Sequence, residues 1–544
     1  MLLGLAAGLT LASPAAMAQV PVIPEIAAAL AVHDRVTLIV TLEPPAAGAD
    51  LRQAIRDRQQ ALIDAIGPDI AVDTRYAMVP VLAVQATAAG LAALQAHPLV
   101  VSIAPNRLFG QFNSPAAGEL ALAPRPIDPA RAAGLPTGTL EARPPRQGDG
   151  RAAAPLARPA APTTATRLAQ PENLRTIGAP AVWDAGHNGA GQFVAVLDNG
   201  VETSHPAFAG KTMVEACFSQ SDPANRVFSL CPGRVVAAEG PGAASACPDT
   251  TLTDTCDHGT HVAGIATGNA PAAGVYGVAP QADVIAIQVF TRYWHPRRQT
   301  WALGAFTTDY LAGLDHVADL AQANPGRIAS ANMSLGGGEF DNFCDTAAVD
   351  AADPGVIAAR MLVNQLRDLG ISTVIAAGND GLRGRLASPA CVTPAVSVAA
   401  TNAQDTYSVN ADTNLAAFPL VFVAAPGDLI LSSITRGRYD RYSGTSMAAP
   451  MVAGALAVLH QAYPGRQAFD YETALARGGK SLVLDGRFRL PRLDLPVSDA
   501  ILAGNVSGGS LTQPYQPNSP VSYIQYPARG NEGWSWYKRQ LYVP

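Results

Sequence analysis

Charge is scarce in this sequence. Asp, Glu, Lys and Arg make up 15% of the 544 residues, below the roughly 25% that is usual for soluble domains. The hydrophobic fraction of 48% excludes a wholly disordered chain. The 37 Lys and Arg residues face 43 Asp and Glu residues, and no basic run is long enough to follow a phosphate backbone. Nucleic acid is therefore not an expected partner.

Long apolar runs are missing beyond the N-terminus. No later segment offers the roughly 18 consecutive apolar residues that a membrane-spanning helix requires, so no membrane span is expected. The apolar run Leu2–Ala12, followed by the small residues Ala16 and Ala18, indicates an export signal over residues 1–18 and a secreted or periplasmic protein. An ordinary Ala-rich helix is the alternative, because no basic residue precedes the run.

Cysteine is rare, but the number of cysteines is even. The six residues are compatible with three disulfides in an oxidising compartment, and free buried thiols are the alternative. CxxC-type spacing is absent, so a zinc site is not expected. Sequence cannot choose among the pairings. Closure of local loops favours Cys217 with Cys231 and Cys247 with Cys256, which leaves Cys344 with Cys391.

Residues 34–106 alternate short strands and helices. The expected strands are 36–42, 71–78, 79–87 and 100–105, and the expected helices are 51–66 and 88–97. The order βαββαβ is a split βαβ sandwich, which predicts a small, self-contained α+β domain without an obvious reactive residue. Residues 107–170 are rich in Pro, Ala and Arg, a composition that favours an extended linker because it cannot bury a core.

Residues 171–504 alternate apolar runs of strand length with helical stretches. The expected strands are Phe193–Leu197, Val284–Phe290, Ile328–Leu335, Thr373–Ala377, Val396–Ala400 and Val421–Ala424. Strands that are apolar on both faces and separated by helices predict an α/β domain, with a parallel sheet covered by helices on both faces. Ligands bind at the carboxyl ends of the strands in such sheets, so these ends are where chemistry is expected.

Two segments at strand ends and helix starts carry a carboxylate and an imidazole. Asp198 ends a buried run, where a carboxylate can orient an imidazole and stabilise its charged form. His258 enters an Ala/Gly-rich helix, where a neutral histidine suits a general base. Alone, Asp198 is also a common turn residue. His258 with His261 could indicate a metal, but the glutamate of an HExxH motif is absent.

Two further segments carry an amide and a hydroxyl. Asn379 follows the run 373–377, where a side-chain amide can donate to an oxygen that becomes anionic. Ser446 is expected in the first turn of a buried helix that continues through 451–463, with Pro450 tolerated in the same turn. A turn asparagine and an N-cap serine are the simpler interpretations of each residue alone.

Together these segments resemble the subtilisin-like serine proteases, the subtilases. The matching motifs are LDNGV, HGTHVAG, NMSLGGG, AAGND and GTSMAAPMVAG, and the chain order is Asp, His, Ser. The resemblance implies Ser446 as nucleophile, His258 as general base and Asp198 as orienting carboxylate. It also implies an oxyanion hole formed by Asn379 and the Ser446 N–H. The implied substrate-binding residues are Ser334, Leu335, Gly336, Gly337, Ala376, Ala377 and Gly378.

The resemblance covers roughly residues 173–495 and implies a serine endopeptidase that acts on proteins or peptides. With the export signal it predicts an exported enzyme, and a monomer is expected. The 34–106 domain resembles the inhibitory propeptide of the family, which implies a self-processing zymogen with its own propeptide as inhibitor. A catalytically silent binding protein of the same fold, and an esterase or amidohydrolase with the same triad, are the alternatives.

Some features depart from the family pattern. Asn199 replaces the Thr or Ser that is common after the aspartate, and residues 217–256 form a cysteine-bearing insertion that could rim the cleft. Residues 268–277 occupy the place of a common calcium loop, but oxygen ligands are few, so no cofactor is expected. The tail 505–544 matches no pattern that indicates a function.

Overall fold

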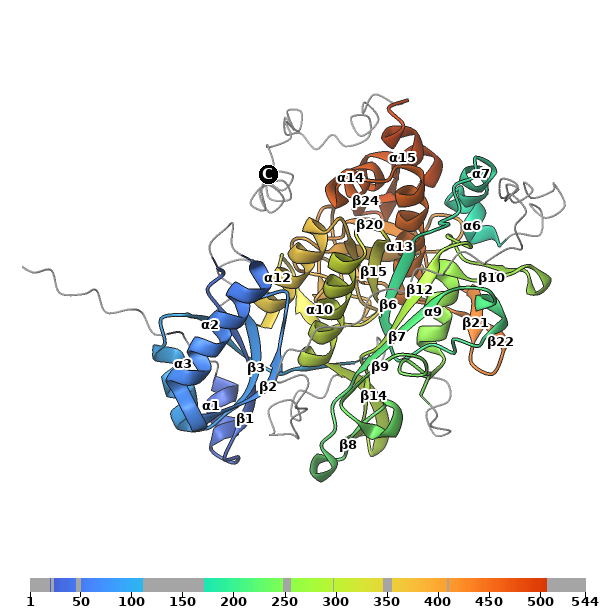
Figure 1. Ribbon diagram of the computed structural model, residues 1–544. Coiled ribbons are helices and arrows are strands. Elements are labelled where there is room, and N and C mark those ends of the chain that lie inside the picture. The colour runs from blue at the N-terminus through green and yellow to red at the C-terminus, as the bar shows by residue number, and fades with distance from the viewer. Residues whose placement is uncertain are drawn as a thin grey trace, which may run out of the picture.

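The computed structural model describes residues 20, 24–45, 50–110, 171–247, 256–296, 298–345, 355–408 and 410–505 (Figure 1). The predicted signal peptide, most of the predicted linker and nearly all of the tail lie outside these residues. Within them, no helix is both long enough and apolar enough to cross a membrane.

A ten-stranded sheet forms the centre of the C-terminal domain. Its order is β23-β24-β20-β19-β17-β15-β6-β12-β7-β9, and the strands from β20 to β7 are parallel. The bounds are β6 Phe193–Asp198, β7 Met213–Phe218, β9 Ala237–Glu239, β12 Asp283–Gln288, β15 Ile328–Met333, β17 Ser372–Ala376, β19 Val396–Thr401, β20 Val423–Pro426, β23 Lys480–Leu484 and β24 Phe488–Arg492. The predicted parallel α/β sheet is confirmed.

Helices cover both faces of this sheet (Figure 1). On one face lie α9 His258–Thr267 and α13 Thr445–Ala462, and on the other lie α10 Thr307–Ala323 and α12 Gly355–Asp368. Alternation along β6 supplies both interfaces: Val194 and Val196 pack with α9 and α13, whereas Ala195 and Leu197 pack with α10 and α12. Among the described residues of the domain, the other α-helices are α6 Glu172–Thr176, α7 Ala179–Asp184, α14 Ala468–Gly478 and α15 Leu495–Leu502.

The N-terminal unit is a four-stranded antiparallel sheet of order β2-β3-β1-β4. Its elements are α1 Pro24–Leu30, β1 Val36–Leu42, α2 Leu51–Ile66, β2 Ile70–Arg75, β3 Val81–Ala86, α3 Ala88–Ala96 and β4 Val100–Pro105. On one face of the sheet, Leu38 and Val40 pack with residues of α2 and α3. On the other face, Ile39 and Ala83 belong to the hydrophobic cluster of α10 and α12. The N-terminal unit therefore has a core of its own on one face of its sheet, and the C-terminal domain covers the other face.

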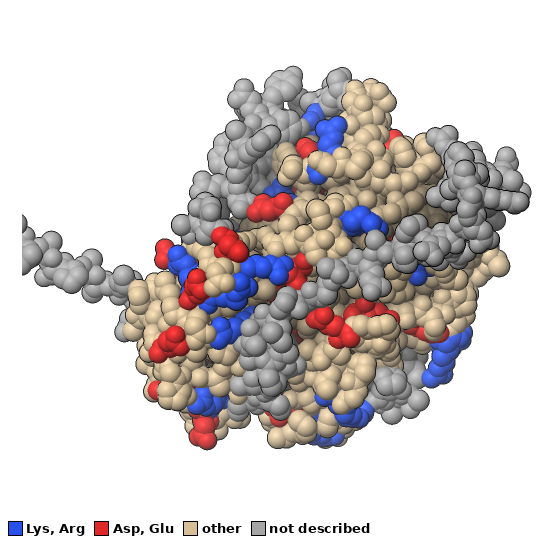
Figure 2. Space-filling view, in the orientation of Figure 1, with Lys and Arg blue, Asp and Glu red and all other residues tan. Residues whose placement is uncertain are grey.

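The turn between β2 and β3 contacts α10. The backbone N–H groups of Ala77 and Met78 each donate to the carboxylate of Asp315 at 2.9 Å. These amides take no part in strand pairing, which is why β2 ends at Arg75, before the predicted residue 78, and β3 begins at Val81, after the predicted residue 79. Arg52 of α2 forms a second contact, an ion pair with Asp319 of α10. Figure 2 shows basic and acidic side chains interspersed over the N-terminal unit and its border with the C-terminal domain.

A second, smaller sheet joins the N-terminal unit to the C-terminal domain. Its order is β5-β14-β13-β8, with β5 Leu108–Gly110, β8 Val227–Ser229, β13 Thr291–His295 and β14 Thr300–Phe306. Strand β5 runs antiparallel to β14, with Leu108 opposite Phe306 and Gly110 opposite Gly304. Residues 108–110, predicted as the start of a linker, are therefore an edge strand.

Candidate active site

A hydrogen bond joins two of the predicted site residues. Asp198 is the last residue of β6 and is fully buried, and His258 is the first residue of α9. His258 Nδ1 lies 2.8 and 3.0 Å from the two carboxylate oxygens of Asp198. A carboxylate in this position accepts the Nδ1–H and leaves Nε2 as the nitrogen that can accept a proton.

Asn199, which departs from the family pattern, connects β6 to α9. Its Oδ1 accepts the N–H of Gly259 at 2.9 Å. This N–H is one of the first-turn amides that have no acceptor inside the helix. A Cβ at Gly259 would lie 2.3 Å from the carbonyl oxygen of Gly200, so only glycine allows this approach. Asn199 and Gly259 therefore help to hold Asp198 and His258 together.

His261 does not form a metal site with His258. Its ring is buried and stacks on Tyr442 with centroids 4.4 Å apart, and its Nε2 lies 3.1 Å from the carbonyl oxygen of Asp440. Burial lowers the pKa of His261 to about 3, so this ring is neutral near pH 7. In the described part of the chain, no group of three His, Cys, Asp or Glu residues could hold a metal ion.

Ser446 lies in the first turn of α13, as predicted from the sequence. Its side chain is buried, and its hydroxyl has no hydrogen-bond partner among the described residues. The Ser446 hydroxyl is therefore not hydrogen-bonded to His258 in this structure. The Ser446 N–H is one of the amides at the helix start that no intrahelical carbonyl accepts. Residue 446 thus brings an unbonded hydroxyl and an N–H donor to the same turn.

Asn379 is oriented by the start of α13. Its Oδ1 accepts the backbone N–H and the hydroxyl of Thr445, each at 2.8 Å, which leaves Nδ2 as a donor. A Cβ at Gly444 would lie 2.9 Å from Asn379 Nδ2 and 3.6 Å from the Ser446 nitrogen. Both donors therefore border one small space that Gly444 keeps open. An oxygen with developing negative charge is the ligand that such a donor pair suits.

Pro450 is not in the first turn of α13, where the sequence placed it. The helix begins at Thr445, and Pro450 lies inside it. Since proline has no N–H, the carbonyl of Ser446 loses its partner four residues later. The Ser334 hydroxyl donates to this carbonyl at 2.9 Å, and the Asn332 amide donates to Ser334 Oγ at 3.0 Å. The side chain of Ser334 thus holds the backbone of Ser446.

The predicted substrate-binding residues lie at the ends of β15 and β17. Ser334 and Leu335 are fully buried and follow β15, which is shorter than predicted because it ends at Met333. Gly337 begins β16 Gly337–Phe340, which pairs with β18 Leu386–Ser388. Gly336 and Gly337 have no side chains, so only their backbone atoms can contact a ligand.

The other predicted substrate-binding residues, Ala376, Ala377 and Gly378, lie at the end of β17. The side chains of Ala376 and Ala377 are buried. Gly378 has a φ of 114°, and a Cβ there would lie 2.2 Å from Asn414 Nδ2, so the position requires glycine. The Gly378 N–H donates to the Thr445 hydroxyl at 3.1 Å, which connects this segment to the start of α13.

Strand β14, which pairs with β5, was not predicted from the sequence. The apolar stretch before Thr307 was the available signal, but Gly304 and two alanines give it little strand propensity. The favoured disulfide pairing, by contrast, is confirmed: Cys217 bonds to Cys231, Cys247 to Cys256, and Cys344 to Cys391.

Comparison with known proteins gives the family. The model of the subtilase family matches residues 189–478, more than half of the chain and a range that contains Asp198, His258, Asn379 and Ser446. An intracellular serine protease of Paenibacillus polymyxa is 30% identical over 296 residues, which cover 54% of this chain and 73% of that protein. Alkaline serine exoprotease A of Vibrio alginolyticus is 28% identical over 362 residues, 66% of this chain and 55% of that protein. The crystal structure of a cold-adapted subtilisin-like serine proteinase is 26% identical with a TM-score of 0.40, covering 56% of this chain and 89% of that one. The chain belongs to the subtilase family of serine endopeptidases.

Proposed function

We propose that this protein is an exported serine endopeptidase that hydrolyses peptide bonds through an acyl-enzyme on Ser446, His258 and Asp198. One observation carries the proposal: the bonded Asp198–His258 pair occurs in the same domain as a buried, unbonded Ser446 hydroxyl with two N–H donors around one space. These are the groups that acyl transfer from a peptide requires.

In the proposed reaction, Ser446 Oγ attacks the scissile carbonyl carbon while His258 Nε2 takes the hydroxyl proton. Asp198 stabilises the imidazolium, and Asn379 Nδ2 with the Ser446 N–H stabilises the oxyanion. The carbon–nitrogen bond then breaks as His258 returns the proton to the leaving amine. Water, deprotonated by His258, attacks the resulting ester and releases the acid and the free Ser446 hydroxyl.

The proposed substrate is an extended peptide between two backbone segments. Residues 334–337 would pair with it on one side and β14 on the other, because main-chain hydrogen bonds suit peptides of many sequences. The position of β5 supports this role for β14, since β5 is an extended segment paired along it. The relatives named above are serine proteases, which favours a protease over the binding-protein and esterase alternatives.

The N-terminal unit is proposed to be an inhibitory propeptide that the enzyme itself removes. Its contacts support this role: β5 occupies the β14 edge, Asp315 accepts two N–H groups of the β2–β3 turn, and Arg52 pairs with Asp319. Cleavage within residues 111–170 would free a monomeric catalytic domain over 171–504. The predicted signal at 1–18 and the three disulfides support export.

A fluorophosphonate probe tests the proposed chemistry. The matured protein is expected to take up one probe per chain at Ser446, to lose activity in proportion, and to cleave casein before labelling. Peptide mapping by mass spectrometry locates the probe, and denatured protein serves as the unreactive control. Labelling at another residue would contradict the triad. Hydrolysis of small esters with intact casein would favour an esterase.

Ser334→Ala is expected to lower kcat about tenfold with little change in KM. The substitution leaves the Ser446 carbonyl buried without a donor, a loss of roughly 1–3 kcal/mol that acts on the turn holding the nucleophile. Kinetics on a peptide substrate, with thermal unfolding alongside, measure both effects.

Ser388→Ala is the matched control for Ser334→Ala. Ser388 is equally buried, but its hydroxyl has no hydrogen-bond partner among the described residues. If Ser334→Ala lowered stability while kcat stayed at the wild-type value, Ser334 would not position the nucleophile.

A further inference from the structure

We propose that the catalytic domain has a binding site for a branched aliphatic side chain of the substrate, built partly by the cysteine-bearing insertion and filled in this structure by Leu108. The inference rests on the proposed function, because β5 has to leave before a substrate can take its place. The Leu108 site is defined by the residues Val227, Tyr293, Ala302, Gly304 and Phe306.

The walls of the Leu108 site are apolar and exclude water. Leu108 is 3% exposed and forms one hydrophobic cluster with Val227, Tyr293, Ala302 and Phe306. These residues come from three strands of the small sheet, β8, β13 and β14. Burial of a leucine side chain among them is favourable in proportion to its apolar area, whereas a carboxylate there would lose its hydration without gaining a partner.

Gly304 makes room for the leucine. A Cβ at this position would lie 2.8 Å from Leu108 Cδ1 and 3.0 Å from Cγ, closer than van der Waals contact allows. Gly304 does not have a positive φ, so its backbone would accept a side chain. The glycine is therefore needed for the space above it and not for the shape of the strand.

Strand β5 shows how a peptide would present its side chains. Successive side chains of an extended peptide point to opposite faces. Leu108 points to the cluster with Val227, while Phe109 points to the other face and packs edge-on against Tyr310, with centroids 5.7 Å apart. A peptide that followed the same register would place one residue opposite Phe306 in the Leu108 site and the next residue beside Tyr310.

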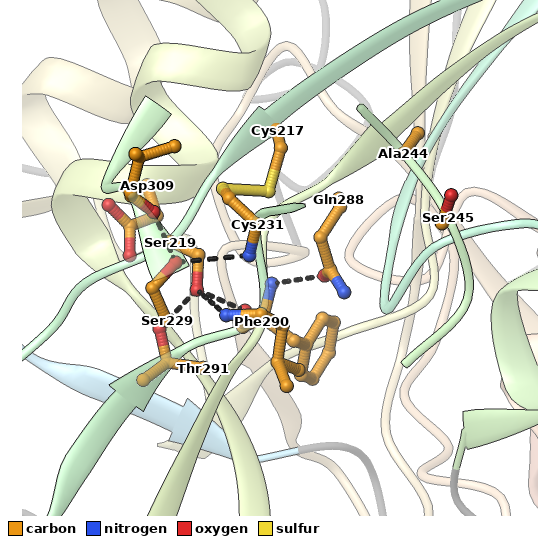
Figure 3. Close-up of a disulfide and its surroundings, with 12 residues drawn as sticks. Cys217, Ser219, Ser229, Cys231, Ala244, Ser245, Gln288, Phe290, Thr291 and Asp309 are labelled. Carbon is orange, nitrogen blue, oxygen red and sulfur yellow. Dashed lines mark hydrogen bonds between the residues drawn. A yellow bond between two sulfur atoms is a disulfide. The ribbon is translucent and has the colours of Figure 1, made fainter. Parts of the chain in front are cut away.

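The insertion holds its wall of the site in place. The Cys217–Cys231 disulfide (Figure 3) closes a loop, and Val227 lies within this loop. Inside this loop, the Ser219 hydroxyl donates to the Phe290 carbonyl at 2.7 Å and accepts the N–H of Leu230 at 3.0 Å. The first bond joins the loop to the segment between β12 and β13, and the second joins the two ends of the loop. The insertion therefore holds Val227 in a fixed position. A fixed wall is what a site requires in order to distinguish substrate side chains by their shape.

The test compares peptide substrates that differ only at the residue opposite Phe306. The series carries Leu, Ala or Asp there, with Phe fixed at the next position. The enzyme is matured from the full chain carrying Leu108→Ala, so that maturation does not depend on the site. We expect kcat/KM for the Leu peptide to exceed that for the Ala peptide about tenfold, and that for the Asp peptide by more.

Gly304→Val in the same chain is expected to abolish the preference for Leu over Ala, because its side chain fills the space. The preference for Phe at the next position should persist, since that side chain lies on the other face. Thr300→Val, at the exposed start of β14, is the control that keeps both preferences.

Equal cleavage of the three peptides by an enzyme that still cleaves casein would overturn the site and leave the proposed function standing. A Gly304→Val enzyme that kept the Leu preference would do the same. If the Gly304→Val chain does not mature, the peptide series is measured on the enzyme that retains Gly304, and its Leu preference alone tests the site. Absence of both casein cleavage and fluorophosphonate labelling would instead refute the proposed function.

Discussion

Replacing Ser446 with Ala is expected to abolish proteolysis and to leave the N-terminal unit joined to the catalytic domain. No other group in the proposed reaction can form the acyl-enzyme, and in subtilisin the loss of the nucleophilic serine lowers kcat by about 10⁶-fold. The hydroxyl has no hydrogen-bond partner among the described residues, so its removal should leave the temperature of unfolding near that of the uncut parent chain. Intact mass of the purified product and casein turnover measure the outcome.

The control for Ser446→Ala is Ser443→Ala, which removes a nearby serine hydroxyl that bonds to Asp428 at 2.8 Å. This variant should mature and cleave casein. Wild-type maturation of the Ser446→Ala chain, expressed without other proteases, would show that self-cleavage does not depend on this residue. A mature Ser446→Ala protein that cleaved casein would remove Ser446 from the mechanism altogether.

Asp198→Asn is expected to lower kcat by about 10⁴-fold, with KM nearly unchanged. An asparagine amide can donate to His258 Nδ1, which would move the ring proton to Nε2, the nitrogen that has to accept the proton of Ser446. It would also remove the charge that stabilises the imidazolium. The 2.8 Å bond between Asp198 and His258 makes the ring directly sensitive to this change.

Steady-state kinetics on one peptide substrate measure the effect of Asp198→Asn, and circular dichroism checks the fold. Asp345→Asn is a matched control, because Asp345 is a buried carboxylate that accepts from Thr393 in another part of the domain. A wild-type kcat in the Asp198→Asn enzyme would exclude the carboxylate from orienting His258. A large loss of kcat in both variants would point to general damage of the domain.

Short-range patterns made most of the secondary structure and the site residues predictable. The strand β6 ends at Asp198 because an apolar run meets a turn. Helix α9 begins at His258 and α13 begins at Thr445, directly before Ser446, because polar residues give way to small apolar ones. Closure of short loops also favoured the Cys217–Cys231 and Cys247–Cys256 disulfides, whose partners are 14 and 9 residues apart. Each of these features depends on residues that are near one another in the chain.

Long-range contacts decided the rest. The sequence shows that Pro450 lies four residues after Ser446, so the Ser446 carbonyl has no intrahelical N–H donor. It does not show that the Ser334 hydroxyl donates to this carbonyl instead. The sequence predicts strands within residues 71–87. It does not show that the Asp315 carboxylate accepts the N–H groups of Ala77 and Met78, which therefore take no part in strand pairing.

The amino-acid sequence by itself determined the subtilase family, the parallel α/β sheet and the residues that carry the proposed chemistry, because motifs and periodicity are properties of neighbouring residues. Only the tertiary structure decided that β5 occupies the edge of β14, that Leu108 fills a site walled by Val227 and Tyr293, and that Ser334 holds the backbone of Ser446. The physical reason is that packing and hydrogen bonding depend on distance in space, and the groups concerned lie far apart along the chain.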